Sequence, residues 1–191
     1  EEHYNVISAL IKSMRASDPD AAIYWLMRML EAGEDPLFVA RRMIIFAAED
    51  IGNADPRALQ IAVAAKDAFH FIGLPEGRIP LSQAATYLAT APKSNASYRA
   101  MLAAGAAVKQ HGALPVPLAL RNAPTPLMKG LGYGADYRYP HDYDEALVTQ
   151  QCLPDTLADA RFYEPTDRGA EAAIGERMRD ARIRKGQTVD E

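Results

Sequence analysis

The sequence predicts an all-α protein, and three observations carry that prediction. Three consecutive stretches begin with Asp-Pro and end with Gly: Asp18–Gly33, Asp35–Gly52 and Asp55–Gly73. An Asp accepts hydrogen bonds from the free N–H groups at a helix start, a Pro is tolerated at the first helical position, and a Gly suits the exit. Apolar residues inside the stretches recur at helical spacing, and the many alanines favour helix and close helix packing.

Each of these stretches is expected to form one helix of about four turns. The middle one, residues 37–51, is apolar on more than one face and is predicted to be the most buried of the three. Five further helices are expected around them. They span His3–Met14 with Asn5 as a cap, Pro80–Ala91, a helix from Asn95 or Ser97 to about His111, a short helix Thr125–Leu131, and Thr166–Arg184.

The character of the chain changes after Gly112. Seven prolines lie between residues 113 and 165, a density that breaks regular structure. Six of the fourteen Tyr and Phe residues lie between Tyr133 and Tyr163, so this irregular segment is predicted to be pinned to the helices by its aromatic rings. We therefore divide the chain into a helical core, residues 1–112, and a C-terminal wrap, residues 113–191.

Composition excludes several classes of protein. The 191 residues are 49% hydrophobic and 24% charged, and the net charge of −4 argues against a broad basic face for nucleic acid. The single cysteine, Cys152, allows no disulfide framework; it fits a reducing, cytoplasmic compartment and is expected to be a small buried residue. No apolar run is long enough for a membrane span. Because the first residue is Glu rather than Met, we expect a fragment of a longer protein.

No pattern in the chain predicts catalysis, a cofactor site or a metal site. His141 lies beside Asp142, but no nucleophile accompanies them. The glycines of 129–134 lack the order of a phosphate-binding loop, and no Walker motif occurs elsewhere. The basic residues of 177–185 encircle their helix, as is typical of a solvated helix. The chain is thus predicted not to be an enzyme by itself.

One group of residues remains a candidate for binding nucleic acid. Basic side chains alternate with tyrosines in the irregular segment, and rings beside positive charge can stack single-stranded bases. Structural anchoring is the alternative role for the same tyrosines. The candidate DNA contacts are Lys93, Arg121, Lys129 and Arg138, and the candidate stacking or anchoring rings are Tyr133, Tyr137 and Tyr139.

A series of motifs in the chain resembles one known family. They are HYNVISALIKS at 3–13, SDPDAA at 17–22, AEDIG at 48–52, APKSN at 91–95, PVPL at 115–118, LRNAPT at 120–125, LMK at 127–129, LGYG at 131–134, YPHDY at 139–143 and FYEPT at 162–166. In this order they resemble the C-terminal region of the RarA/MgsA family of replication-associated recombination ATPases. This family is related to the Werner-helicase-interacting protein.

The resemblance implies a fold and a function for the chain. It implies a helical oligomerisation domain similar to the collar of clamp loaders, assembling the protein as a homotetramer. The parent protein would carry an upstream AAA+ ATPase module, which binds ATP and Mg²⁺ and is absent from these residues. It would act in the cytoplasm, associated with the nucleoid, on stalled replication forks, with DNA and single-strand-binding protein as partners. A module that itself contacts single-stranded or forked DNA is the alternative.

Overall fold

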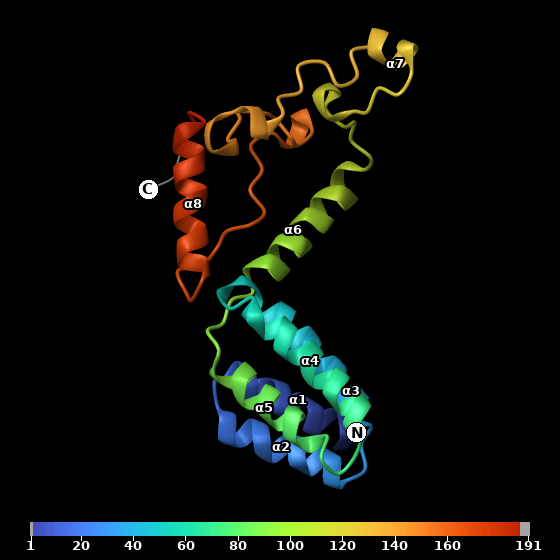
Figure 1. Ribbon diagram of the computed structural model, residues 1–191, viewed down its shortest axis with the longest axis vertical. Helices are drawn as coiled ribbons and strands as arrows, with labels where there is room; N and C mark the ends of the chain where they lie inside the picture. The colour runs from blue at the N-terminus through green and yellow to red at the C-terminus, as the bar shows by residue number, and fades with distance from the viewer. Residues whose placement is uncertain (1, 188–191) are drawn as a thin grey trace. The chain divides into compact units, whose positions relative to one another are not determined.

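The computed structural model describes residues 2–187, and in this range the chain is all-helical, as predicted. Eight α-helices are present and no strand occurs among the described residues (Figure 1). An irregular stretch precedes the last helix, again as predicted. The helices are α1 (Glu2–Arg15), α2 (Pro19–Glu31), α3 (Pro36–Phe46), α4 (Arg57–Ile72), α5 (Arg78–Thr90), α6 (Ala96–His111), α7 (Pro126–Gly130) and α8 (Glu171–Arg184).

The Asp-Pro starts of α2 and α3 are confirmed in atomic detail, whereas α4 begins at Arg57, one residue after Pro56. The carboxylate of Asp18 accepts a hydrogen bond of 2.9 Å from the backbone N–H of Ala21, and that of Asp35 accepts one of 2.9 Å from Leu37. Asp55 accepts from the backbone N–H of Arg57 at 3.2 Å. Each carboxylate thereby satisfies an N–H group that has no partner within its helix.

The middle stretch differs in one respect from the expected continuous helix. α3 ends at Phe46, and residues 47–51 form a π-helical turn before Gly52 adopts φ 50°. This stretch buries six residues, against four in the first stretch and five in the third, although Ile45 remains 47% exposed. The helix therefore buries one face rather than its whole circumference.

Three other predicted boundaries were wrong. α1 begins at Glu2, so Asn5 lies inside the helix and is not its cap. α5 begins at Arg78, before Pro80, because the turn from Gly73 already runs into helical geometry. α6, by contrast, begins at Ala96, directly after the predicted cap position Asn95, and the backbone N–H of Ala96 donates to the hydroxyl of Ser94 at 3.1 Å. α8 begins at Glu171, five residues after the expected start.

The chain folds into two compact units. We call residues 1–100 with 163–175 the core unit, and residues 101–162 with the described residues from 176 onward the second unit. Helix α6 begins in the core unit and continues into the second, and α8 does the same. The predicted division at residue 112 stays a prediction.

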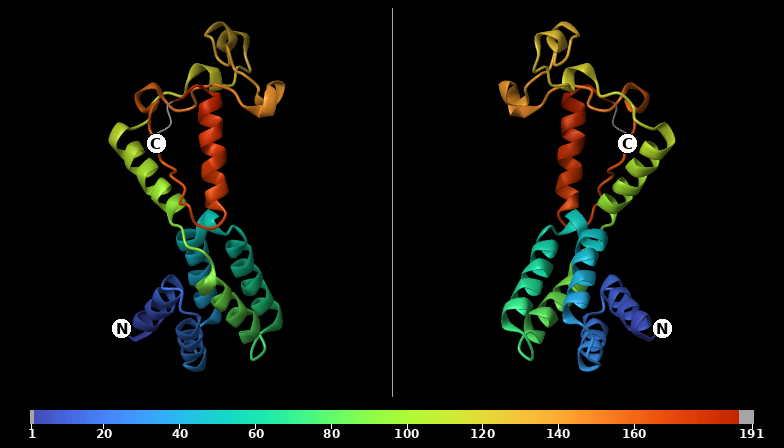
Figure 2. Two further views of the ribbon diagram at one scale, coloured as in Figure 1. Left: turned by 90° about the vertical axis from the view of Figure 1, so that its left-hand side faces the viewer. Right: turned by 90° about the vertical axis from the view of Figure 1, so that its right-hand side faces the viewer.

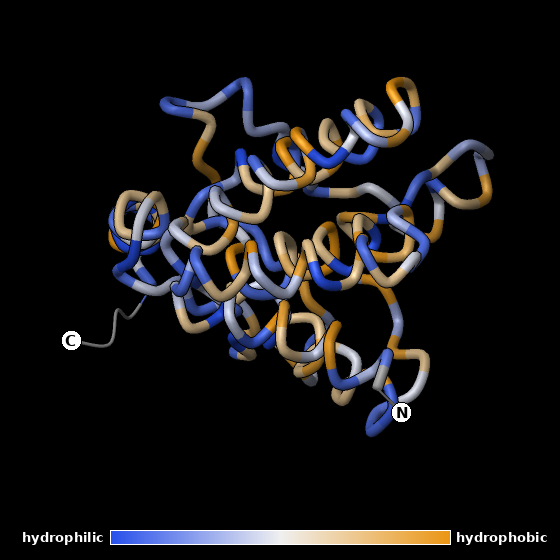
Figure 3. The backbone as a smooth tube through the Cα atoms, turned by 90° about the horizontal axis from the view of Figure 1, so that it is seen from below, coloured by the Kyte–Doolittle hydropathy of each residue, from blue (hydrophilic) through white to orange (hydrophobic). Residues whose placement is uncertain are grey.

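Helices α1 to α5 pack together within the core unit. α1 packs on α2, α2 on α5, α4 on α5 and α3 on α4 (Figures 1 and 2). Apolar and polar residues alternate along the turns of these helices (Figure 3), so that each helix contributes one apolar face to a shared core. Leu10, Met14, Leu26, Phe46 and Leu88 are among its fully buried side chains. Of the helices in the described part of the chain, none is both long and apolar enough to cross a bilayer.

Candidate functional site

A segment far along the chain returns to the core unit and docks on it. We call residues 163–175 the strap. The backbone N–H of Ala170 donates to the carbonyl of Ala54 at 2.8 Å, and Arg168 Nε donates to the carbonyl of Lys93 at 2.6 Å. Gly169 permits this approach: its φ is +54°, and a Cβ atom there would lie 2.2 Å from the Ala54 oxygen. The strap thus closes directly over the backbone at the start of α4.

Glu171 anchors the strap and has no exposed surface. The hydroxyl of Tyr163 donates to its Oε2 at 2.7 Å, that of Thr166 donates to its Oε1 at 3.0 Å, and Ser94 supplies a further hydrogen bond. Burial by itself raises the pKa of a carboxyl, but these donors outweigh burial and hold the pKa of Glu171 below its ordinary value. Glu171 therefore remains a carboxylate at neutral pH, satisfied by hydroxyl donors rather than by a cation.

Sequence reasoning missed Glu171. It is one of several charged residues in the last part of the chain, and nothing in its local sequence distinguishes it from the others. The FYEPT motif at 162–166 supplies two of the three donors, Tyr163 and Thr166, but its sequence does not reveal which acceptor they share. Only the return of the strap to Ser94 brings the donors and the acceptor together.

Lys93, a predicted DNA contact, lies in the core unit and is occupied by protein groups. Its ammonium donates to the carbonyl oxygens of Ala89 and Ala91 at 2.9 and 2.6 Å, and to Ser17 Oγ at 3.2 Å. Burial lowers its pKa. In this position the ammonium group satisfies carbonyl groups at the end of α5 that lack a partner within the helix. A cation is favourable there because the C-terminal end of a helix dipole is negative. Its contact with DNA stays a prediction.

The second unit brings Arg121 and Tyr133 together. The guanidinium carbon of Arg121 lies 4.9 Å from the centroid of the Tyr133 ring, and Arg121 Nε donates to the carbonyl of Val116 at 2.7 Å. The backbone N–H of Gly134 donates to the carbonyl of Leu118 at 2.8 Å. Arg121 and Tyr133 therefore form a cation–π pair, and the hydrogen bond between Gly134 and Leu118 fixes the backbone beside it.

The other predicted contacts are on the surface of the second unit. Lys129 is exposed in the last turn of α7, whose start is capped by Thr125. Arg138 is also exposed, and its backbone N–H donates to Gln150 Oε1 at 3.2 Å. Tyr137 and Tyr139 are 51% and 53% exposed. Whether these two rings stack on bases or anchor the segment stays a prediction.

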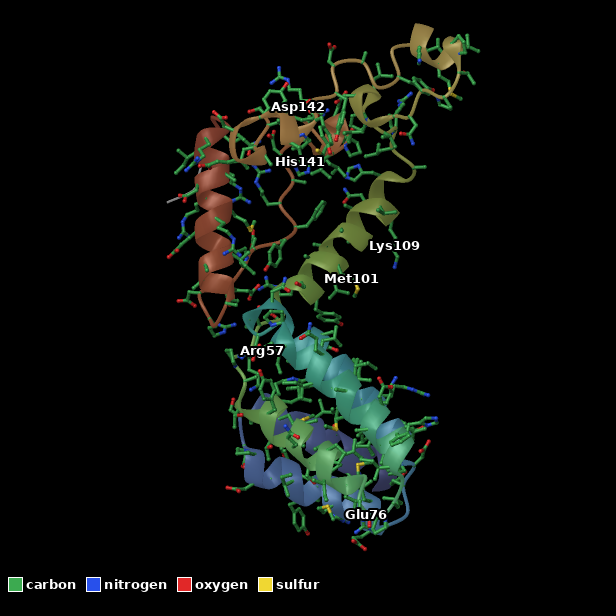
Figure 4. All side chains as sticks on the ribbon, viewed as in Figure 1. Arg57, Glu76, Met101, Lys109, His141 and Asp142 are labelled. Atoms are coloured by element: carbon green, nitrogen blue, oxygen red, sulfur yellow. The ribbon has the colours of Figure 1, made fainter. Side chains whose placement is uncertain are left out.

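Cys152 and the neighbouring pair of His141 and Asp142 are the remaining residues considered for chemistry. Cys152 is exposed, so the prediction of a buried residue was wrong; it lies in an irregular surface segment that lacks helical packing. His141 and Asp142 occupy a short exposed turn (Figure 4). Across residues 2–187, no three His, Cys, Asp or Glu side chains gather in an arrangement that could hold a metal ion.

The second unit differs from the core unit in its burial. None of its described residues is buried, whereas the core unit holds a continuous apolar core. Met101, which projects from α6 in Figure 4, is 60% exposed, and Val108 is 66% exposed. Helix α6 also borders an apolar groove of about 470 Å³, whose lining lies entirely within this unit. Apolar surface of this kind marks a site of interaction.

Comparison with known proteins identifies the chain. The sequence profile of a family described as MgsA AAA+ ATPase C terminal matches residues 16–182. Replication-associated recombination protein A of Coxiella burnetii is 53% identical over 179 residues, covering 93% of this chain and 41% of that protein. The protein of the same name from Escherichia coli K12 is 51% identical, covering 93% and 40%. ATPase WRNIP1 of Dictyostelium discoideum is 48% identical over 162 residues, covering 84% and 18%.

The chain is thus an all-helical C-terminal domain of an AAA+ ATPase. It belongs to the MgsA/RarA family, as its motifs indicated. It spans about two fifths of the length of the bacterial relatives named above.

Proposed function

We propose that this domain assembles copies of its parent protein into a homo-oligomer, a homotetramer, through the second unit. The parent would be a clamp-loader-like ATPase acting in DNA replication, recombination and repair at stalled forks. Of this, the names of its bacterial relatives support the association with replication and recombination. ATP and Mg²⁺ would bind to its ATPase module, outside this chain. DNA and single-strand-binding protein as partners, and a place at the nucleoid in the cytoplasm, belong to the same proposal.

The observation that carries the proposal is the missing core of the second unit. Its described part comprises residues 101–162 and 176–187, and none of these is buried. Fixing a residue of backbone costs about 1–2 kcal/mol of conformational entropy, which burial of apolar surface must offset. A unit of this size with no buried residue lacks that offset. Apolar side chains covered by a second copy would supply it, as in obligate interfaces that resemble a divided core.

The solution mass tests the proposal. Light scattering of the chain across a concentration series is expected to give a defined oligomer, with four copies at saturation. A monomer at every concentration would rule out assembly through this domain. The chain alone is also expected to turn over no ATP, and turnover that co-purifies with it would contradict the assignment of that activity to another module.

Contact with single-stranded or forked DNA is the second candidate function. The observation in its favour is the fixed pair of Arg121 and Tyr133, which offers a cation and a ring at one place. Binding would weaken steeply with salt because phosphate contacts release counterions. Arg121→Ala and Arg138→Ala are expected to lower the affinity and the salt dependence, while Arg179→Ala, an exposed arginine of α8, serves as the control. Unchanged binding in the first two variants would exclude this site.

A further inference from the structure

The second unit carries an apolar groove that none of residues 2–187 fills. Helix α6 contributes Ala104, Ala107 and Val108 to one side, and Leu153, Leu157 and Phe162 contribute to the other. The groove has a volume of about 470 Å³, within the range of about 300–1,000 Å³ typical of ligand pockets. None of its ten lining residues carries a charge. Its occupant must therefore be apolar, because a charged group would lose its hydration there without gaining a partner.

The same unit also presents an apolar projection. Leu127 and Leu131 are 73% and 58% exposed, and they stand four residues apart at α7, so they lie on one side of it. The hydroxyl of Thr125 accepts from the backbone N–H of Met128 at 3.3 Å, and the N–H of Tyr133 donates to the carbonyl of Met128 at 3.1 Å. The two leucines are thus held on a short helix that is tied at both ends.

We propose that the leucines of α7 in one copy of the chain fill the α6 groove of a neighbouring copy. This inference rests on the proposed self-assembly and names its contact. Within the described part of a single chain both partners are open: the leucines are exposed, and the groove is unfilled. Both belong to the unit that has no buried residue, so joining them between copies supplies part of the core that the unit lacks.

Charge supports a second copy as the occupant. Lys129 lies between the two leucines and is exposed. Asp159 lies between Leu157 and Phe162, which both line the groove, and it is exposed as well. Insertion of α7 beside this wall would bring a cation of one copy near a carboxylate of the next. In this arrangement Lys129 serves the subunit contact rather than DNA.

The contact also agrees with a closed assembly. Different surfaces of the two copies meet in it, so every copy offers one groove and one projection. Such head-to-tail contacts close into a ring when the rotation between copies allows it. A ring of four copies would use four identical contacts and leave no groove empty.

Cysteine pairs in the full chain test the contact. All variants carry Cys152→Ser, which removes the natural thiol. A Leu127→Cys chain is mixed with a Val108→Cys chain and treated with a short bis-maleimide. We expect covalent dimers that contain one chain of each kind, and no dimers from either variant alone. Leu102→Cys replaces Val108→Cys in the control, because Leu102 is exposed on the same helix but does not line the groove.

The outcomes separate this contact from self-assembly in general. Mixed dimers through Val108 but not through Leu102 support the proposal. An oligomer of unchanged mass that forms no mixed dimers overturns the contact while leaving self-assembly intact. A wild-type chain that is monomeric overturns both. As an independent measure, Lys129→Asp is expected to weaken assembly several-fold and Asp159→Lys to restore it; no restoration would contradict the pairing of these two charges.

Discussion

The hydroxyl of Tyr163 donates a 2.7 Å hydrogen bond to the carboxylate of Glu171, a residue with no exposed surface. The same hydroxyl accepts from Asn53 Nδ2 at 3.3 Å, and Asn53 Nδ2 also lies 3.3 Å from Ser97 Oγ. This network links the strap to the segment before α4 and to the first turn of α6. Since a buried carboxylate without donors would be strongly unfavourable, the strap depends on all of its partners.

Glu171→Gln is expected to destabilise the core unit by about 1–3 kcal/mol, because an amide offers one acceptor oxygen where the carboxylate has two. The lowered pKa of Glu171 also makes stability depend on pH. A carboxyl whose folded pKa lies below its unfolded value stabilises the fold above that unfolded value, near 4.5, and loses this contribution as the pH falls further.

Urea denaturation between pH 7 and pH 3 measures both effects. The Glu171→Gln variant should lose part of its acid sensitivity relative to the wild type. Glu176→Gln is the matched control, since Glu176 is exposed in the same helix. If the two variants behave alike, the hydrogen-bonded carboxylate is not what stabilises the strap.

Gly169→Ala is expected to detach the strap. The added Cβ atom would meet the carbonyl oxygen of Ala54 at 2.2 Å and the ring of Pro92 at 2.7 Å, and the backbone itself is in the left-handed region. Gly186→Ala shares the positive φ but meets no atom within 4 Å, so it reports the backbone cost alone. Limited proteolysis should cleave the strap of Gly169→Ala much faster than that of Gly186→Ala. Equal cleavage would mean that the close approach is not required.

Replacement of Asp by Asn should have different effects on stability at two of the Asp-Pro starts, Asp55 and Asp18. Asp55 is 6% exposed and accepts hydrogen bonds from Tyr87 and from Arg57 Nε, the latter at 3.0 Å. Asp18 is exposed and caps its helix by accepting from the backbone N–H of Ala21. Burial raises the pKa of Asp55, but the hydrogen bonds from Arg57 and Tyr87 outweigh it and lower the pKa overall. Asp55→Asn is therefore expected to cost about 1–3 kcal/mol, as for a hydrogen bond to a charged group.

Asp18→Asn provides the comparison, because Asn caps a helix about as well as Asp does and should cost only a few tenths of a kcal/mol. Thermal unfolding of both variants at neutral pH measures the difference. The destabilisation by Asp55→Asn should shrink as the pH falls below the ordinary pKa of 3.8, and it should vanish once the carboxyl of the folded wild type is protonated too. Equal midpoints for the two variants at neutral pH would exclude the special role of Asp55.

Self-assembly through the second unit makes thermal stability depend on protein concentration. Association stabilises the folded state by mass action, so the unfolding midpoint should rise with concentration. Calorimetry over a hundredfold range of concentration measures this rise. In Leu127→Asp with Leu131→Asp the rise should be reduced, since both leucines are exposed and their replacement does not disturb the chain itself. A midpoint independent of concentration in the wild type would argue against assembly.

Local chemistry made the helices of the core unit predictable. Asp18 and Asp35 act as caps as their position before a proline indicated, and Gly33 adopts φ 82° at the end of α2. The short helix α7, with its Thr125 cap, was also correctly placed. These features depend on residues within a few positions of one another, which a sequence displays directly.

The errors arose where distant parts of the chain meet. Cys152 was expected inside because its residue type is commonly buried, but its segment belongs to a unit without a core. The start of α8 was predicted too early: Thr166 lies in the strap, where its hydroxyl donates to Glu171, the first residue of the helix. Lys93, selected for its charge, donates to carbonyl groups at the end of α5.

By itself the sequence determined the helical class, the family and the positions of most helices, because caps, periodicity and motifs act over a few residues. Only the tertiary structure decided that Glu171 is a buried carboxylate and that the second unit has no core of its own. The burial of Glu171 depends on contacts between distant segments, such as that between Asn53 and Tyr163, which lie 110 positions apart. Such contacts follow from the path of the whole chain, since burial and hydrogen-bond partners are properties of the space around a residue.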